Sequence, residues 1–133
     1  MREIILHLNS NPATGHSTNN FTQSQFELYK EINISQGAWF CTVLEFETEA
    51  DIVEDVYLCC DFVDHSIVNG RPIRALKGLK GTTRGRIYYP IETEIPISVA
   101  TLQNIKLYIS GSLSSHSYRQ KNWSVTLKIF KNI

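Results

Sequence analysis

The feature that most constrains the fold of this chain is the stretch VEDVYLCCDFVDHSIVNG, residues 53 to 70. Between residues 56 and 63 the side chains follow the two-residue period of a β-strand, and nearly all are apolar on both faces. A strand of this kind lies inside a sheet, where both of its faces are covered. Asp64-His65 ends the strand, and Asn69-Gly70 is a strong turn-forming pair. We therefore predict a central strand of a β-sandwich.

The rest of the chain contains further short segments of the same period, separated by polar loops. We predict strands over residues 2 to 8, 26 to 34, 38 to 48, 73 to 76, 87 to 97, 105 to 110 and 123 to 129. Pro90 and Pro96 confine their segment to sheet edges or to strand ends, and only residues 99 to 104 fit a single turn of helix. About eight strands in 133 residues predict one domain, residues 1 to 133, with an all-β fold: an antiparallel β-sandwich built as a single jelly roll.

Composition excludes several classes of protein. With 42% hydrophobic and 20% charged residues, the chain is expected to fold rather than to stay disordered. Its 13 basic and 13 acidic residues give no net charge, so bulk charge predicts neither a nucleic-acid binder nor a membrane-surface protein, and it favours assembly. No stretch approaches the roughly 20 apolar residues of a membrane span. The start, MREIILHLNSN, is too short an apolar run for a signal peptide, so we expect that the protein is not secreted.

The residues that usually carry chemistry form no complete motif. Cys59 and Cys60 are neighbours in a strand and point to opposite faces, so with Cys41 they are expected to be reduced, buried thiols. The four histidines lack HxH or HExxH spacing and no CxxC is present, which predicts no metal site. Gly78, Gly81 and Gly85 lack the GxxxxGK[ST] pattern of a phosphate-binding loop. We therefore expect no catalytic residue, no cofactor and no enzymatic activity.

Three stretches, in collinear order, carry a resemblance to a known family. Residues 5 to 49 contain ILHLNSN, NNFTQSQF, INI and GAWFCTVLE; residues 56 to 79 read VYLCCDFVDHSIVNGRPIRALKGL; residues 94 to 110 read EIPISVATLQNIKLYIS. Together they resemble the single-jelly-roll, penton-type capsid proteins of Polinton and adintovirus-type elements and of their virophage relatives. These motifs encode strands and turns rather than chemistry. Where that family has a Leu-Leu-Arg run, this chain has Arg74-Ala75-Leu76-Lys77.

The resemblance implies a structural protein that self-assembles as a capsid component. A vertex pentamer is the favoured form, with other capsid proteins as partners, located in the virion and made in the host cytoplasm or nucleus. The alternative is a virion-surface module that binds a receptor or a glycan, with a trimer as its candidate form. For such a module the loop residues of suitable type are Tyr118, Asn19, Asn20 and His116.

Two sets of residues are candidate contacts. The segment from Arg71 to Arg86 has six basic residues and no acid. Its simplest interpretation is a solvated loop, but it could also face a genome or an acidic patch on a neighbouring subunit through Arg74, Lys77, Lys80, Arg84 and Arg86. The second set consists of apolar or aromatic side chains expected to face outward, and is a candidate subunit interface: Tyr57, Val63, Tyr88, Tyr89, Tyr108 and Phe130.

Overall fold

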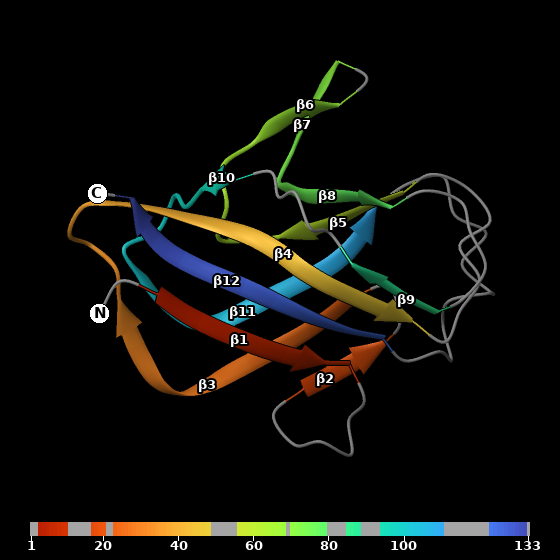
Figure 1. The fold of residues 1–133 in the computed structure, drawn as a ribbon, viewed down its shortest axis with the longest axis horizontal. Coiled ribbons are helices and arrows are strands. Elements are labelled where there is room, and N and C mark those ends of the chain that lie inside the picture. The colour runs from red at the N-terminus through yellow and green to blue at the C-terminus, as the bar shows by residue number, and fades with distance from the viewer. Residues whose placement is uncertain are drawn as a thin grey trace.

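The protein consists of two antiparallel sheets that lie face to face, with a short hairpin projecting from them (Figure 1). The computed structural model describes residues 3–10, 17–20, 23–48, 56–68, 70–79, 85–88, 94–110 and 123–132. The first sheet contains β1 (Glu3–Asn9), β12 (Trp123–Asn132) and β4 (Ala38–Thr48), with β9 (Gly85–Tyr88) and β10 (Ile95–Pro96) both paired to β4. The second runs β2 (Ser17–Asn20), β3 (Gln23–Asn33), β11 (Thr101–Ser110), β5 (Val56–Cys60) and β8 (Ala75–Leu79). The hairpin pairs β6 (Ser66–Val68) with β7 (Arg71–Ile73).

The order of the strands is that of a single jelly roll. If the short strands β2, β6, β7 and β10 are set aside, eight strands remain. Counted along the chain, the first, eighth, third and sixth form one sheet, and the second, seventh, fourth and fifth form the other. This interleaving is a pair of nested Greek keys. The predicted all-β antiparallel sandwich is therefore confirmed.

The strand from which the prediction began is β5, which lies between β11 and β8 inside its sheet, as expected. It is shorter than predicted, because the chain turns at Asp61 and Phe62 and the alternation ends there. Val63 then forms an isolated bridge with Ile97 and is 0% exposed. The prediction that Val63 faces outward, as part of a subunit interface, is therefore wrong. The helical turn over residues 99 to 104 is also wrong, since β11 begins at Thr101.

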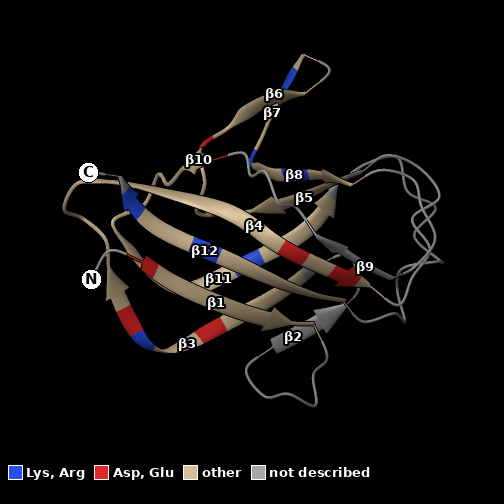
Figure 2. Ribbon diagram, in the orientation of Figure 1, with Lys and Arg blue, Asp and Glu red and all other residues tan. Residues whose placement is uncertain are grey.

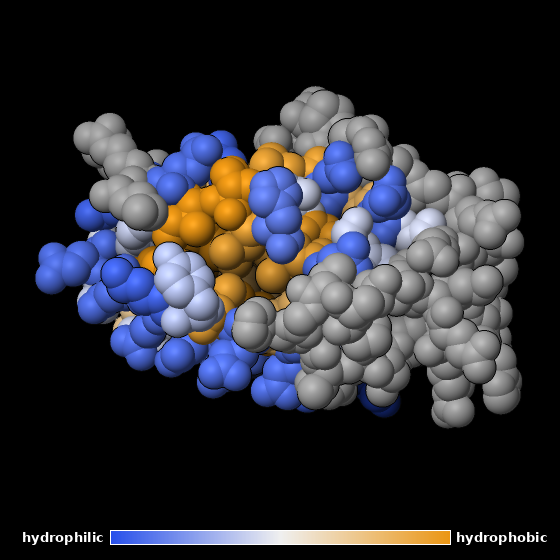
Figure 3. Space-filling model, turned by 90° about the horizontal axis from the view of Figure 1, so that it is seen from below, coloured by the Kyte–Doolittle hydropathy of each residue, from blue (hydrophilic) through white to orange (hydrophobic). Residues whose placement is uncertain are grey.

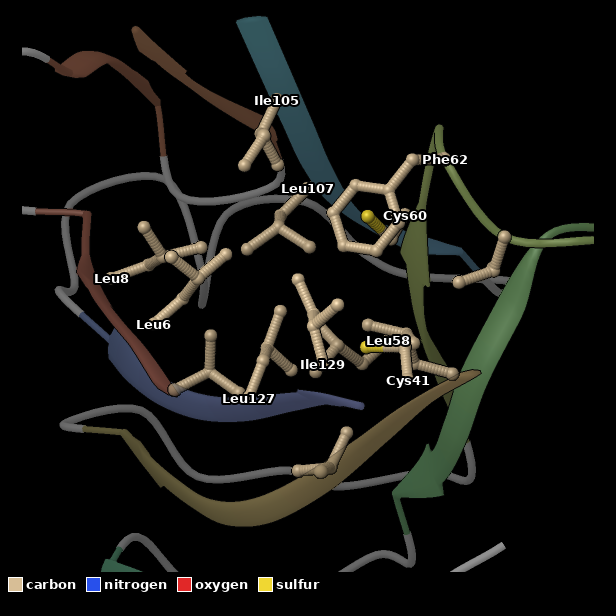
Figure 4. Packing of buried hydrophobic residues seen from close by; sticks show 14 of the residues in the cluster. Leu6, Leu8, Cys41, Leu58, Cys60, Phe62, Ile105, Leu107, Leu127 and Ile129 are labelled. Carbon is tan, nitrogen blue, oxygen red and sulfur yellow. The ribbon is translucent and has the colours of Figure 1, made fainter. Parts of the chain in front are cut away.

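The core fills the space between the two sheets. In Figure 4 the side chains of Leu6 and Leu8 from β1 and of Leu127 and Ile129 from β12 point toward those of Leu58 and Cys60 from β5 and of Ile105 and Leu107 from β11. Each fully buried aliphatic side chain contributes about 1.5–3 kcal/mol through removal from water. Trp123 lies at one end of this core, stacked on Phe46 with ring centroids 6.1 Å apart and edge-on to Phe26 at 6.4 Å.

All three cysteines are free and buried, as the sequence predicted. Cys41 and Cys60 belong to the core between the sheets. Cys59 is also buried, next to Cys60 on β5, and pairs across the sheet with Tyr108. No helix in the described ranges is long and apolar enough to cross a membrane.

Candidate functional site

A large bulge in β3 sets the shape of the open side of the sandwich. Strand β3 pairs with β11 on both sides of the bulge, as Glu27 with Asn104 and as Ile32 with Leu102. Between these pairs, residues 28–31 of β3 face the single residue Gln103 of β11. Extra residues on one strand force it to bend out of the sheet. Accordingly, β3 swings away from β11 and curves beneath β1 in Figure 1.

The bend of β3 leaves an apolar groove along the edge of the sandwich. The groove has a volume of about 580 Å³ and is lined by Ile4 and Leu6 of β1, Leu28 and Ile32 of β3, and Trp39 of β4. Figure 3, which views the molecule from this side, shows a broad apolar patch with hydrophilic side chains along much of its border. Ile4, Leu28 and Ile32 pack against the core but stay partly exposed. The two sheets therefore do not close over their own apolar interior on this side.

The rim of the groove is polar and includes an aromatic ring that is almost fully exposed. Tyr29 is 95% exposed, and Lys30, Glu31 and Asn33 beside it are exposed as well. A large ring that is almost wholly in water gains nothing from the fold of its own chain. Tyr29 is therefore available to a partner or a ligand.

Local hydrogen bonds fix the end of the groove where β3 leads into β4. The Oδ1 atom of Asn33 accepts hydrogen bonds from the amide of Ser35 at 2.9 Å and from its hydroxyl at 2.6 Å, which is an Asx turn that ends the strand. The indole Nε1 of Trp39 donates to the carbonyl of Gln36 at 2.8 Å. Gly37 supports this connection with a positive φ of 87°. Because the polar end of Trp39 is satisfied within the chain, its ring serves as an apolar wall.

The second exposed feature is the β6–β7 hairpin, which stands clear of the two sheets (Figure 1). Its turn contains Gly70, whose φ of 79° suits the turn that Asn69-Gly70 predicted. Ile67 on β6 is 71% exposed. The hairpin is anchored at its base, since the guanidinium of Arg74 donates to the carbonyl of Val63 at 2.5 Å and to the hydroxyl of Ser98 at 3.0 Å.

Of the candidate residues for nucleic-acid or subunit contact, the structure describes the side chains of Arg74 and Lys77 alone. Arg74 is half-buried and is the anchor of the hairpin. Lys77 is half-buried in β8. Arg86 belongs to β9, where its backbone pairs with that of Glu47 in β4. Lys80 and Arg84 lie outside the described residues. The prediction that this basic set contacts nucleic acid therefore stays a prediction.

The predicted subunit-interface residues lie on two faces. Tyr57 and Tyr108 are half-buried on β5 and β11 of the second sheet. Phe130 lies on β12 of the first sheet, where its ring stacks on that of Phe40 with centroids 5.9 Å apart, and the Nζ of Lys128 lies 5.0 Å from its centroid. Tyr88 is placed only by its backbone in β9, and Tyr89 is outside the described residues. Tyr118 and His116 of the glycan alternative are outside them as well, and Asn19 and Asn20 are placed in β2 without their side chains.

The buried thiols are poor nucleophiles. Burial raises the pKa of Cys41 and of Cys60 well above the usual value, and it raises the pKa of Cys59 to about 11 despite a hydrogen bond from the Tyr108 side chain that lowers it. The pKa of Tyr108 is also raised, mainly by burial and next by electrostatic repulsion from Cys59. Asp61, beside these thiols, accepts a hydrogen bond from the amide of Lys106 at 3.1 Å. Within the part of the chain that the structure describes, no group of three or more His, Cys, Asp or Glu residues could hold a metal ion.

The groove was not among the sites predicted from the sequence, although the sequence contains one signal for it. Phe26, Leu28, Ile32 and Ile34 share the inward parity of β3, and Lys30 interrupts that parity. A charged residue on the core-facing side of a strand indicates that the strand leaves the sheet there. The same bend of β3 away from the sheet leaves the ring of Tyr29 exposed.

Comparison with known proteins places the chain in no family. No family model matches it, and no curated protein matches it. Among solved structures, the CBM36-1 domain of a multidomain xylanase from the hindgut metagenome of Trinervitermes trinervoides is similar over 98% of both chains, with 11% identity and a TM-score of 0.47. The coat protein of Tobacco streak virus is similar over 99% of this chain and 86% of its own, with 12% identity and a TM-score of 0.41.

A third similar structure is the Drosophila NLP core, which was described for pentamer formation and histone binding. It is similar over 98% of this chain and 99% of its own, with 6% identity and a TM-score of 0.40. These three proteins thus include a carbohydrate-binding module, a viral coat protein and a pentameric histone binder. At such identities and TM-scores, none of them carries an inference about the role of this chain.

Proposed function

We propose that this chain is a structural protein that assembles with itself, as a penton-type capsid component of a Polinton-like element. The observation that carries the proposal is the apolar groove between β1 and β3. The side chains of Ile4, Leu28 and Ile32 pack against the core but stay partly exposed. A contiguous apolar patch of this kind marks an interaction surface. A neighbouring subunit that covers them gains the free energy of removing that surface from water.

Three further features support assembly into a capsid. The jelly-roll strand order is the architecture expected of a capsid component. The collinear resemblance of residues 5 to 49, 56 to 79 and 94 to 110 adds the vertex role. The absence of net charge removes the repulsion that would keep identical subunits apart. On this proposal the protein is not an enzyme, it is located in the virion, and its partners are copies of itself and other capsid proteins.

Light scattering coupled to size-exclusion chromatography tests the proposal. At micromolar concentration we expect a homo-oligomer with a mass near five times the 15.2 kDa of one chain. A mass near three times that of one chain keeps self-assembly but contradicts the vertex role. A monodisperse monomer across the micromolar range contradicts the proposal as a whole.

A second candidate function, glycan binding, is favoured by Tyr29. A nearly fully exposed aromatic ring beside a groove, with the polar side chains of Lys30, Glu31 and Asn33 around it, suits the stacking and hydrogen bonding of a sugar. Binding to a glycan panel that is lost in Tyr29→Ala, in a protein that is monomeric, would favour this function. Binding that is unchanged in Tyr29→Ala contradicts it.

A further inference from the structure

We propose that the β6–β7 hairpin of one subunit occupies the apolar groove between β1 and β3 of the next subunit. This inference rests on the proposed self-assembly and names the contact that produces it. The two surfaces have complementary shapes, and neither is covered by a described part of its own chain. The hairpin is a projecting arm with an exposed apolar side chain, and the groove is a recess with an apolar lining.

The hairpin has the shape and surface of an inserting element. Gly70 closes a tight turn, so that the arm is narrow, and Arg74 fixes its base to Val63 and Ser98. The arm is therefore held in a defined direction before it meets a partner, which lowers the entropy lost on binding. Ile67 on this arm is 71% exposed. Burying an aliphatic side chain of this size contributes about 1.5–3 kcal/mol.

The groove is large enough and apolar enough to accept such an arm. Its volume of about 580 Å³ exceeds what one isoleucine side chain occupies, and it is typical of sites that enclose several apolar groups. Its walls are the side chains of Ile4, Leu6, Leu28, Ile32 and Trp39. Inserting Ile67 there would bury apolar surface on both partners. Tyr29 at the rim would then lie over the inserted arm.

The backbone of β1 offers hydrogen bonds beside the groove. β1 pairs with β12 on one side, and no strand that the structure describes pairs with its other edge beside Ile4 and Leu6. An exposed sheet edge next to an apolar recess is the arrangement that accepts an added strand. The short strand β6, which pairs with β7 on one side, can extend this edge with its other side.

The charges on the two surfaces are complementary. Between Ser66 and Ile73 the only charged side chain that the structure describes is that of Arg71, which is exposed. The facing strand β3 carries exposed Glu27 and Glu31 against one exposed Lys30. Figure 2 shows this contrast as blue on the hairpin and mostly red on the bend of β3. The net charge of the arm is positive and that of the bend of β3, counted from Glu27 to Glu31, is negative, so the two surfaces attract each other and two hairpins repel each other.

The positions of the two surfaces make the contact head-to-tail. In Figure 1 the hairpin projects from the top of the molecule, while β1 and the bend of β3 lie at the bottom. A subunit therefore gives its hairpin to one neighbour and receives that of another. Such heterologous contacts close into rings or continue into filaments, and they do not end at a two-fold dimer. This is the type of contact that a vertex pentamer or a surface trimer requires.

Cross-linking tests the contact directly. A double variant, Ile67→Cys with Tyr29→Cys, places one thiol on the arm and one at the rim, and a short bis-maleimide joins them only between subunits. Cys41, Cys59 and Cys60 are buried with raised pKa values, so they react slowly. We expect a ladder of cross-linked species that ends at the full ring. The matched control is Ile67→Cys with Gln25→Cys, since Gln25 is an exposed residue of β3 that does not line the groove.

A second variant tests the same contact without cross-linking. Ile67→Asp places a carboxylate where the apolar side chain would insert, and we expect it to raise the subunit concentration at half-assembly at least ten-fold. Because Ile67 is exposed, circular dichroism and the thermal midpoint of the monomer should not change. Gln25→Asp, which adds the same charge elsewhere, should assemble as the unaltered chain does.

The outcomes separate this inference from the proposed function. If the unaltered chain is an oligomer, but the double variant cross-links no more than its control and Ile67→Asp assembles normally, the hairpin contact is wrong and self-assembly stands. If the unaltered chain is a monomer at all concentrations, both are wrong. A cross-linked ladder together with weakened assembly of Ile67→Asp supports both.

Discussion

Ser10 and Trp123 are joined by two hydrogen bonds where β1 ends and β12 begins. The amide of Ser10 donates to the carbonyl of Trp123 at 2.8 Å, and the amide of Trp123 donates to the Oγ of Ser10 at 2.8 Å. Ser10 is completely buried, so no water replaces either bond. This pair extends the β1–β12 ladder by one residue beyond Asn9 and Ser124, and fixes the position of the Trp123 ring against Phe46.

Replacing Ser10 by alanine should destabilise the fold. Ser10→Ala removes the hydroxyl and leaves the buried amide of Trp123 without that acceptor, which costs about 1–3 kcal/mol. Urea unfolding followed by tryptophan fluorescence measures the loss. Ser35→Ala serves as the control, because Ser35 is exposed and its removal should change the free energy of unfolding by less than half as much. Equal effects of the two substitutions would contradict the role of the buried pair.

Thr42 is expected to be a position where a substitution stabilises the protein. It is buried in β4, and its hydroxyl has no hydrogen-bond partner in the structure as described. Thr42→Val keeps the β-branched shape and removes the cost of burying that hydroxyl, so the free energy of unfolding should rise by about 1 kcal/mol. Thr126→Val is the comparison, since its hydroxyl lies 3.3 Å from the Nδ1 of His7. A loss of stability in Thr42→Val would show that the hydroxyl has a partner.

The fold could be predicted from the sequence because its signal is local. The two-residue alternation in β11 and β12 decides which side chains are buried, and turn residues such as Gly37 and Gly70 decide where strands end. The number of strands, about eight, predicted the single jelly roll without predicting which strands pair. The pairing of β1 with β12 and of β3 with β11, by contrast, joins residues about 120 and about 80 positions apart, and no local pattern encodes it.

The groove and Val63 show where local patterns stop being informative. The alternation predicted that Val63 faces outward, but a turn at residues 61 and 62 reverses the pattern and buries it. The groove arises from a mismatch between two strands, four residues of β3 against one of β11. A mismatch is a property of a pair, so it becomes visible only once the partner strand is known. Lys30 on the inward parity was the one local trace of it.

Alkaline pH should destabilise the protein through its buried thiols. Burial raises the folded-state pKa of Cys59 from about 9 to about 11, so between these values the unfolded chain loses this proton and the folded chain keeps it. Since the unfolded state then binds fewer protons, stability is fully present below pH 9 and falls as the pH rises toward 11. Between these pH values, each such thiol lowers the free energy of unfolding by about 1.4 kcal/mol per pH unit.

Urea unfolding at a series of pH values from 7 to 10.5 measures this dependence. Tyrosine and lysine side chains also titrate in that range, so the informative quantity is the difference in slope between the unaltered chain and Cys59→Ala. We expect the variant to have a shallower decline above pH 9, whatever its stability at pH 7. Identical slopes would mean that the Cys59 thiol ionises as readily in the folded protein as in the unfolded one.

The basic segment can be tested for nucleic-acid contact apart from its structural residue. Arg74 should be left unaltered, because its guanidinium anchors the hairpin and its removal would confound the result. A variant in which Lys77, Lys80, Arg84 and Arg86 are each changed to Glu removes the remaining candidate charges.

If these four side chains contact phosphates, binding of the unaltered chain to DNA should weaken steeply with salt, with a slope of roughly −4 in a plot of log affinity against log salt concentration. The variant should then lose binding, while Lys106→Glu with Lys131→Glu retains it. Binding that does not depend on salt, or no binding at low salt, would contradict nucleic-acid contact and leave the segment as a solvated surface or a protein contact.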